Sequence, residues 1–377
     1  MKKIIILGTT ASSMTGFRLP LIKALLSQNI LVYCMANSFD SSQTLTLKAM
    51  GAIPVEYPVN RTGFNPFQDI SNSYKLYKII KSIEADTILS YFVKPVVYGT
   101  IAAFFAKIPN RFAMIEGLGY FFTEQPTKIS KKVQIIKWIQ IGLYKISLPL
   151  AKGLILLNHD DYNDLIKKYN IKTKNTLIIP GIGLTLDEFP FMPINAQPHP
   201  PTFLFIGRLL KEKGIFEFIE AAKIVKQQYP NTVFRIAGSL DSENPGSLSA
   251  TDIDELNSQG LIQYLGQVDN IPEVISTSDV FVLPSYREGM PRSTQEAMAI
   301  GRPVITTDVP GCRESIINDK HGFIVPKWSA VAIAEKMVQL IKHPNLIEEM
   351  GKEANLYAQQ SYDCKKTNEK IFQFFNN

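Results

Sequence analysis

One order of elements occurs twice in this chain of 377 residues, and that repetition limits the possible folds more than any other feature. Each copy has an apolar run, a polar loop with glycine, a segment with helical spacing and a second apolar run: 2–8, 9–16, 17–28 and 30–36, then 202–207, 208–214, 215–229 and 232–238. A run that is apolar throughout is typical of a strand buried on both faces of a parallel sheet. Two such beginnings predict an α/β protein with two doubly wound, Rossmann-like domains.

The segment DEFPFMPINAQPHPP, residues 187–201, separates the two copies. It contains five prolines and has neither helical nor strand periodicity, which is typical of a linker. The predicted organisation is a first domain over 1–186, a second over 202–360, and a C-terminal helix over 361–377 that packs back on the first domain. Further strands are expected at 87–91, 111–116, 153–157, 176–180, 262–266, 279–284, 303–307 and 322–326.

The net charge of +6 is unevenly distributed. Residues 1–185 have 22 Lys and Arg against 10 Asp and Glu, a net charge of +12, whereas residues 186–377 have 18 against 24, a net charge of −6. The basic half predicts an anionic partner: a phosphate-bearing substrate, nucleic acid or a membrane surface.

The three cysteines, Cys34, Cys312 and Cys364, are far apart and give neither a disulfide framework nor a metal cluster. The four histidines also lack a ligand spacing, so no metal site is expected. This pattern fits a reducing, cytoplasmic location. The first apolar run is too short for a signal peptide, and no run reaches the roughly 18 apolar residues that a membrane span needs.

Two glutamates, Glu288 and Glu296, lie eight positions apart in YREGMPRSTQEAMAIGRPVI, residues 286–305. Glu288 follows the strand VFVLP and falls in the loop at its carboxyl end, where open α/β sheets bind ligands. Pro291 suits the first turn of a helix, which places Glu296 about a turn and a half inside it. Such carboxylates accept hydrogen bonds from the vicinal hydroxyls of a sugar or ribose. The alternative is a solvated loop glutamate and a surface helix glutamate.

A second loop, GRLLKEKG at 207–214, places Arg208 and Lys213 after the first strand of the second domain. A planar guanidinium and a point cation on the same side match a diphosphate. Gly207 and Gly214 permit close backbone approach and a sharp entry into the helix. A basic surface turn is the alternative.

The matching loop of the first domain, SSMTGFR at 12–18, gives a weaker signal. Gly16 opens the expected helix, whose N-terminus could cradle a phosphate. The loop lacks a full G-x-G-x-x-G motif, and no acidic residue follows the second strand in the usual place, so it is a weak nucleotide signature.

Together, these motifs resemble those of glycosyltransferase family 4, retaining enzymes with the GT-B fold, in which two Rossmann-like domains face a cleft. The resemblance rests on GRLLKEKG and, about 75 residues later, EGMPRSTQE, and it extends to PGIGLTLDEFPF at 180–191 and GRPVITTDVPGCRESIINDKHGFIVP at 301–326. It covers nearly the whole chain. The segment IEGLGYFF at 115–122 and the basic stretch after it are similar to the branch that builds bacterial capsule, O-antigen or exopolysaccharide units.

The resemblance implies a role for each matched position. Arg208 and Lys213 would hold the donor diphosphate and stabilise the leaving nucleotide. Glu296 would bind the ribose hydroxyls, and Glu288 would hold hydroxyls of the transferred sugar. The remaining implied donor contacts are Gly16, Gly207, Gly266, Val268, Gly289 and Met290. The family requires no metal, so no cofactor beyond the nucleotide-sugar co-substrate is expected, and catalysis rests on positioning and charge stabilisation.

Many members of the family have a histidine near the end of the fourth strand of the first domain, facing the sugar. This chain reads MIEGLGY there, and Glu116 is the nearest candidate for a catalytic role in that place.

The segment 125–159 contains six lysines and no acidic residue. Lys131, Lys132 and Lys137 alternate with apolar residues that include Trp138. This composition predicts an amphipathic helix in a membrane interface, where a lipid-linked acceptor would be bound. A core-facing helix with solvated lysines is the alternative.

The predicted function is a retaining, metal-independent glycosyltransferase. It would move a hexose or N-acetylhexosamine from a nucleotide donor, expected to be a UDP-sugar, to a glycan or polyprenyl-diphosphate-linked acceptor at the inner face of the cell membrane. The alternatives are a GT-B-type sugar-nucleotide epimerase, which would turn over its substrate without an acceptor, and a non-catalytic carbohydrate-binding protein. Nucleic acid is not expected, because aromatic and basic residues are not interleaved on one face.

Overall fold

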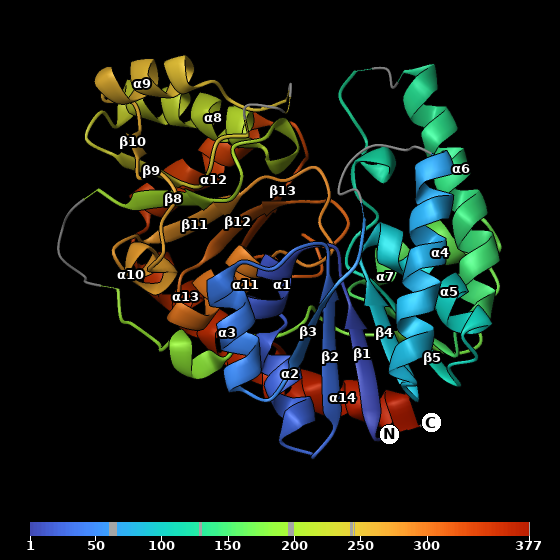
Figure 1. The fold of residues 1–377 in the computed structure, drawn as a ribbon. Helices are drawn as coiled ribbons and strands as arrows, with labels where there is room; N and C mark the ends of the chain where they lie inside the picture. The colour runs from blue at the N-terminus through green and yellow to red at the C-terminus, as the bar shows by residue number, and fades with distance from the viewer. Residues whose placement is uncertain (60–65, 128–129, 195–199, 242–243, 245, 377) are drawn as a thin grey trace. The chain divides into compact units, whose positions relative to one another are not determined.

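The computed structural model describes residues 1–59, 66–127, 130–194, 200–241, 244 and 246–376 (Figure 1). The chain forms two compact units. The first unit comprises Met1–Phe121, Ser130–Ile182 and Cys364–Asn377, and the second comprises Phe122–Ile129 and Gly183–Asp363. Neither unit is one continuous stretch of the chain. Residues 122–129 belong to the second unit, although the predicted first domain, 1–186, includes them.

The first unit contains a parallel seven-stranded sheet in the order β3-β2-β1-β4-β5-β6-β7. Its strands are β1 (Lys3–Leu7), β2 (Leu31–Ala36), β3 (Ile53–Glu56), β4 (Thr87–Tyr91), β5 (Asn110–Ile115), β6 (Gly153–Leu156) and β7 (Thr176–Ile178). Its helices are α1 (Ala11–Thr15), α2 (Leu19–Leu26), α3 (Ser41–Ala49), α4 (Pro66–Ile83), the π-helix η1 (Pro95–Gly99), α5 (Thr100–Phe105), the 3₁₀ turn η2 (Tyr120–Phe122), α6 (Lys131–Ser147), η3 (Leu148–Leu150), α7 (His159–Asp161), η4 (Tyr162–Lys167) and α14 (Cys364–Asn376).

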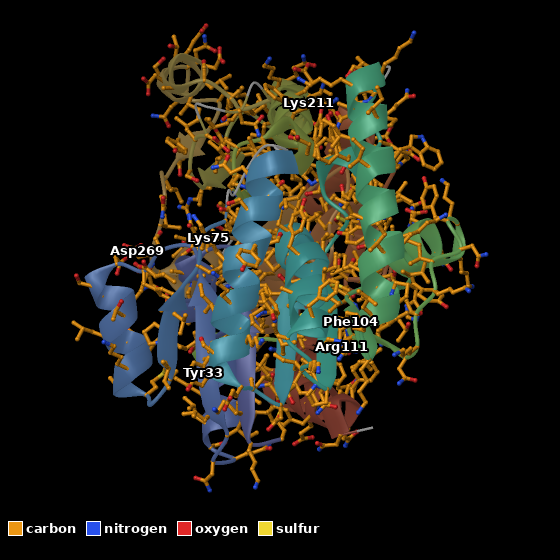
Figure 2. The ribbon with its side chains drawn as sticks, turned by 45° about the vertical axis from the view of Figure 1, so that its right-hand side comes forward. Tyr33, Lys75, Phe104, Arg111, Lys211 and Asp269 are labelled. Carbon is orange, nitrogen blue, oxygen red and sulfur yellow. The ribbon has the colours of Figure 1, made fainter. Side chains whose placement is uncertain are left out.

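Helices cover this sheet because its strands are apolar on both sides. Ile5 and Leu7 of β1 belong to a core cluster with Leu76 of α4 and Ala103 of α5, and Figure 1 shows α4, α5 and α6 together beside the sheet. Phe104 of α5 and Arg111 of β5 lie together in Figure 2, with the guanidinium 5.4 Å from the ring.

The C-terminal helix α14 is part of the first unit. The Phe375 ring lies 4.5 Å from the ring of Phe112 on β5, and the Asn368 side chain donates to the Pro20 carbonyl of α2 at 3.4 Å. The last helix of the chain therefore completes the packing of the first sheet.

The second unit contains a parallel six-stranded sheet in the order β10-β9-β8-β11-β12-β13. Its strands are β8 (Thr202–Ile206), β9 (Val233–Ala237), β10 (Gln263–Tyr264), β11 (Val280–Leu283), β12 (Val304–Thr307) and β13 (Gly322–Val325). Its helices are η5 (Leu186–Glu188), η6 (Lys211–Lys213), α8 (Ile215–Gln228), α9 (Ala250–Ser258), α10 (Ile271–Ser276), α11 (Arg292–Ile300), α12 (Ala330–Lys342) and α13 (Asn345–Ser361). In both sheets the first strand lies centrally, so the strand order reverses beside it, and the loops at the carboxyl ends there diverge to leave room for ligands.

The predicted fold of two doubly wound α/β domains is confirmed, with three corrections in detail. The predicted loop 9–16 contains the short helix α1, and strand β3 was not predicted. The first part of the predicted linker belongs to the second unit, since Phe189 is buried in its core and the Met192 amide donates to the Ile300 carbonyl at 3.0 Å. Residues 195–199 of that linker lie outside the described residues.

Candidate active site

Two glycines, Gly207 and Gly214, determine the backbone path of the loop after β8. Gly207 donates its amide to the Ala237 carbonyl at 3.1 Å, and the chain then turns through η6 to Gly214. Gly214 has a φ of 76°, and a Cβ there would lie 2.1 Å from the Pro284 carbonyl oxygen. Only glycine fits that approach, so the predicted sharp entry into α8 is confirmed.

Lys213 and Glu288, which lie 75 residues apart in the sequence, form an ion pair. The Lys213 Nζ is 2.5 Å from Glu288 Oε1, and only 26% and 12% of the two side chains are exposed. The Ser285 hydroxyl donates to the same oxygen at 2.8 Å. A cation from the loop after β8 and a carboxylate from the loop after β11 therefore meet at the carboxyl ends of the two central strands.

Contacts with α8 and the loop after β12 fix the loop that contains Glu288. The Tyr286 hydroxyl donates to Glu217 Oε1 at 2.6 Å, and burial, with the Glu217 carboxylate next, raises the pKa of Tyr286. The Glu288 amide donates to the Pro310 carbonyl at 3.0 Å. A Cβ on Gly311 would lie 2.3 Å from the Glu288 carbonyl oxygen, so the backbone of residues 288–289 packs directly on Gly311.

Arg208 lies at the exposed edge of the same loop. Its side chain is 54% exposed, and its Nη1 is 3.7 Å from the Asp241 carboxylate, which is also partly exposed. An ion pair of this length in solvent contributes little to stability, about 0–1 kcal/mol. Arg208 is therefore available to an anionic ligand at little cost, in contrast to Lys213.

Glu296 lies in the second turn of α11 and is buried. Burial raises its pKa, and the Arg292 guanidinium, 2.7 Å away, opposes that shift. Pro291 is the N-cap of the helix rather than its first residue, a small correction to the predicted helix start. One glutamate of the sequence motif thus lies in the loop after β11 and the other in α11, and each has a cation of its own.

Three glycines lie side by side at the ends of β8, β9 and β10. The Gly238 amide donates to the Gly266 carbonyl at 2.8 Å. Gly238 has a φ of 148°, and a Cβ there would lie 1.8 Å from the Gly207 carbonyl oxygen. Gly207 and Gly266 were predicted to contact the donor, but Gly238, which joins them, was missed although it also follows a strand directly.

The remaining predicted donor positions of the second unit have different surroundings. Met290 is buried and Gly289 lies in the loop packed on Gly311. Val268 is partly buried against the core of the second unit.

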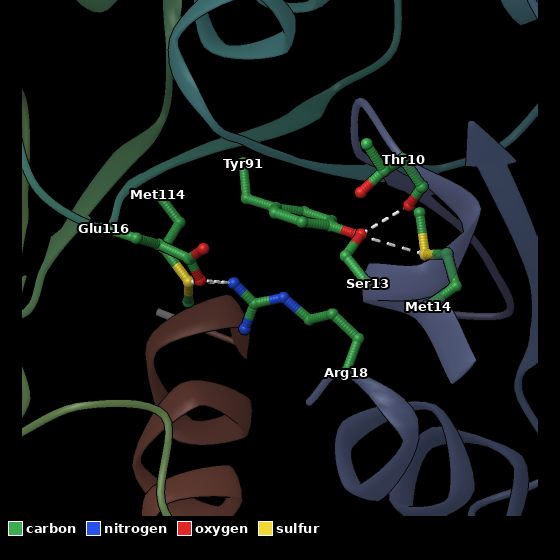
Figure 3. Close-up of polar contacts among 7 residues, drawn as sticks. All are labelled: Thr10, Ser13, Met14, Arg18, Tyr91, Met114 and Glu116. Carbon is green, nitrogen blue, oxygen red and sulfur yellow. Dashed lines mark hydrogen bonds and ion pairs between the residues drawn. The ribbon is translucent and has the colours of Figure 1, made fainter. Parts of the chain in front are cut away.

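In the first unit, Gly16 ends α1 instead of opening a helix, because α2 begins only at Leu19. Glu116, directly after β5, forms an ion pair with Arg18 (Figure 3). Arg18 is fully buried and was not singled out in the sequence.

Helix α6 has one buried and one exposed apolar face. Ile141 and Tyr144 are buried, whereas Ile135, Trp138 and Ile146 are 59%, 63% and 60% exposed. Trp138 packs edge-to-face with Tyr169, with ring centroids 5.6 Å apart.

The lysines of this segment differ in their surroundings. Lys131 and Lys132 are exposed, Lys137 is half-buried, and Lys128 lies outside the described residues. The alternative of an ordinary core-facing helix accounts for Ile141 and Tyr144 but not for the exposed apolar residues.

Metal-binding clusters and membrane-spanning helices are both absent from the described part of the chain. No group of three or more His, Cys, Asp or Glu is arranged to hold a metal ion. No helix there combines the length and apolar character needed to cross a membrane.

A fold of two Rossmann-like units, with charged residues at the carboxyl ends of the second sheet, is typical of glycosyltransferases, and comparisons with known proteins assign the chain to that class. Residues 189–357 match the family described as "Glycosyl transferases group 1", and residues 3–152 match "Glycosyl transferase 4-like". The chain is 32% identical over 370 residues to the N,N'-diacetylbacillosaminyl-diphospho-undecaprenol alpha-1,3-N-acetylgalactosaminyltransferase of Campylobacter jejuni, covering 95% of this chain and 94% of that protein.

A second relative is the UDP-Gal:alpha-D-GlcNAc-diphosphoundecaprenol alpha-1,3-galactosyltransferase of Escherichia coli, 28% identical over 68% of this chain and 67% of its own length. Among solved structures, Anabaena Alr3699/HepE, crystallised with UDP and glucose, has the same fold, with a TM-score of 0.77, 18% identity and full coverage of both chains. The chain therefore belongs to the family 4 glycosyltransferases of the GT-B fold.

Proposed function

We propose that this protein is a retaining glycosyltransferase that moves a sugar, a hexose or N-acetylhexosamine, from a UDP-sugar to a polyprenyl-diphosphate-linked acceptor in bacterial surface polysaccharide synthesis. The Lys213–Glu288 pair supports this proposal most directly, because it places a cation for the donor diphosphate beside a carboxylate for the sugar hydroxyls. The names of the relatives from C. jejuni and E. coli support the acceptor class, since both refer to sugars linked through diphosphate to undecaprenol.

The proposed chemistry requires no covalent intermediate. The acceptor hydroxyl attacks the anomeric carbon on the face from which the nucleoside diphosphate leaves, and its proton passes to the departing diphosphate oxygen. Attack on this face preserves the configuration. Arg208 and Lys213 stabilise the charge that develops on the leaving diphosphate, and Glu288 orients the sugar. The protein contributes position and fixed charge, the two effects that give catalysis without a protein nucleophile.

Incubation of the purified protein with a panel of sugar nucleotides, with and without a short-chain polyprenyl-diphosphate-linked sugar, tests this proposal. Transfer to the acceptor, with the anomeric configuration of the product determined by NMR, is the expected result. Turnover without acceptor to an epimerised sugar nucleotide would indicate an epimerase, and binding without any turnover would indicate a carbohydrate-binding protein.

The two glutamates are expected to have separable roles. Glu296→Gln should weaken binding of the bare nucleoside diphosphate by about tenfold, the effect of losing one charge-assisted contact. Glu288→Gln should leave that affinity unchanged and reduce transfer instead. Calorimetry with UDP and steady-state kinetics measure the two effects, with the exposed Glu349→Gln on α13 as control. Equal losses of UDP affinity in the two variants would contradict the division of roles.

No metal is expected to assist, because Arg208 and Lys213 supply the positive charge that a divalent cation would otherwise provide. Activity in excess EDTA should therefore stay within about twofold of that of the untreated protein. Loss of one charge-assisted contact would lower the activity by considerably more. Complete loss with EDTA, restored by magnesium or manganese, would contradict this prediction.

The exposed face of α6 is expected to bind anionic membranes. Each lysine near the surface contributes about 1 kcal/mol, and the exposed Ile135, Trp138 and Ile146 would enter the interface. Changing Lys131, Lys132 and Lys137 to Glu should reduce binding to phosphatidylglycerol liposomes by more than about 100-fold.

The control for this prediction changes Lys223, Lys342 and Lys352 to Glu, which alters the net charge equally on exposed residues of the second unit. Liposome co-sedimentation at low and high salt measures the effect. UDP affinity should be the same in both variants. If the unmodified protein does not sediment with the liposomes at low salt, α6 is not a membrane helix.

A further inference from the structure

Arg18 in the first unit is a buried cation whose donors are only partly satisfied. It is 1% exposed, and burial lowers its pKa to about 10, so it remains charged at neutral pH. Its guanidinium pairs with Glu116 and donates from Nη2 to the Met114 sulfur at 3.0 Å. Its Nε has no partner among the described residues. A thioether is a weak acceptor, so the carboxylate of Glu116 is the main compensation for this buried charge.

A second buried arginine, Arg302, is an example of a structural arginine in this chain. Arg302 is 2% exposed, and its Nε and both terminal nitrogens donate to backbone carbonyls. Those of Ser278, Met192 and Ser276 lie at 2.6, 2.7 and 2.8 Å. Arg302 therefore joins separate segments of the second unit. The Arg18 side chain makes no comparable set of contacts with the backbone of the described residues. An ion pair of its kind often contributes less to stability than apolar residues of the same volume.

The surroundings of Arg18 nevertheless fix it in one position (Figure 3). The guanidinium lies 4.3 Å from the centre of the Tyr91 ring. The Tyr91 hydroxyl is 2.6 Å from the Ser13 hydroxyl and 3.3 Å from the Met14 sulfur. A Cβ on Gly8 would lie 2.2 Å from that hydroxyl, so residue 8 must be glycine for the tyrosine to occupy this place. Side chains from the loops after β1 and from β4 thus hold the cation rigidly.

Glu116 is the member of the ion pair that keeps some exposure to solvent. It follows β5 directly, at the carboxyl end of the first sheet, and its side chain keeps 12% exposure. Arg18 pairs with Oε1, which is buried. Oε2 makes no hydrogen bond or ion pair with a described residue. One oxygen is therefore anchored, and the other is left to accept a hydrogen bond from a ligand.

We infer that Arg18 is a positioning residue: it holds Glu116 as a fixed carboxylate whose free oxygen accepts a hydrogen bond from a hydroxyl of the acceptor sugar. The inference rests on the proposed glycosyl transfer and adds that the first unit orients the acceptor through this pair. A carboxylate paired with a guanidinium accepts hydrogen bonds and donates none. A misplaced hydroxyl reacts slowly even when it binds, so the effect should fall on kcat.

The test compares Arg18→Met/Glu116→Gln, Arg18→Lys and the control Arg302→Met. The double variant replaces the ion pair with neutral side chains of similar size, so its Tm should lie within about 3 °C of the unmodified protein. Its kcat for transfer should fall by about 100-fold. Its affinity for UDP should be unchanged. Arg18→Lys should retain more activity than the double variant, and Arg302→Met should lower Tm without lowering the kcat of the folded protein.

The outcomes separate this inference from the proposed function. If the unmodified protein transfers no sugar, the proposed function fails. If it transfers sugar and the double variant does so at the same rate, Arg18 and Glu116 have no part in the reaction. If kcat falls only in proportion to a fall in Tm, or UDP affinity falls with it, the pair is structural.

Discussion

Lys213→Ala should reduce kcat/KM for sugar transfer by about 100-fold or more, since it removes a charge-assisted contact worth about 1.5–3 kcal/mol and leaves a partly buried carboxylate without its cation. The loss should exceed that of Arg208→Ala, because Arg208 is 54% exposed and its contact is screened by solvent. Steady-state kinetics with the donor identified from the panel measure both effects. Lys223→Ala, in an exposed pair with Glu220 on α8, is the control and should have no effect on transfer.

The double variant Lys213→Ala/Glu288→Gln shows which function of the lysine matters. If Lys213 binds the diphosphate, neutralising Glu288 as well will not restore transfer. Recovery to near the rate of Glu288→Gln alone would show that Lys213 serves only to balance the carboxylate, and the proposed diphosphate clamp would be wrong.

Gly238→Ala should lower the Tm of the second unit by about 6–12 °C, which corresponds to about 3 kcal/mol in a unit of this size. The new Cβ would lie 1.8 Å from the Gly207 carbonyl oxygen, so the ends of β8 and β9 must separate. UDP affinity should fall as well, because Gly207 and Gly266 would both be displaced. Thermal denaturation followed by circular dichroism, with and without UDP, measures these changes.

Gly260→Ala is the matched control. Gly260 also has a positive φ, 67°, but nothing lies within 4 Å of its ideal Cβ. Gly260→Ala should lower the free energy of unfolding only by the cost of a left-handed conformation, about 1 kcal/mol, and should leave UDP affinity normal. Similar losses in the two variants would mean that backbone conformation, and not the close approach to Gly207, is what requires glycine at position 238.

The sequence predicts most of the fold because the strands are apolar runs with little ambiguity. β8 and β11, for example, are buried along their whole length. β3 is different: Ile53–Glu56 is short, only partly buried, and contains Pro54. Proline is tolerated at the edge of a sheet, where β3 lies, but it removes the local signal for a strand. The helix α1 was missed because its five residues show no side-chain cap.

The sequence predicts which loops form the candidate site, but not which of their side chains contact one another. Glycines and charged residues directly after strands identify the loops, since parallel strands bring their carboxyl ends to one edge. The partner of each charge depends on tertiary geometry that local patterns do not report. Nothing in the sequence indicates that Lys213 and Glu288 also pair with each other, and the Arg18–Glu116 pair joins residues 98 positions apart.

Because α14 belongs to the first unit, it affects the order in which the two units can fold. Phe374 packs where only Gly153 leaves room and Phe375 packs against Phe112, yet both residues follow the whole second sheet in the sequence. Folding during synthesis normally proceeds from the N-terminal domain onward. Here the second unit can fold while the first still lacks α14, so the first unit keeps an uncovered apolar surface until that helix has been synthesised. A stop codon before Cys364 should therefore yield a chain whose first unit aggregates, although no residue of either sheet has been lost.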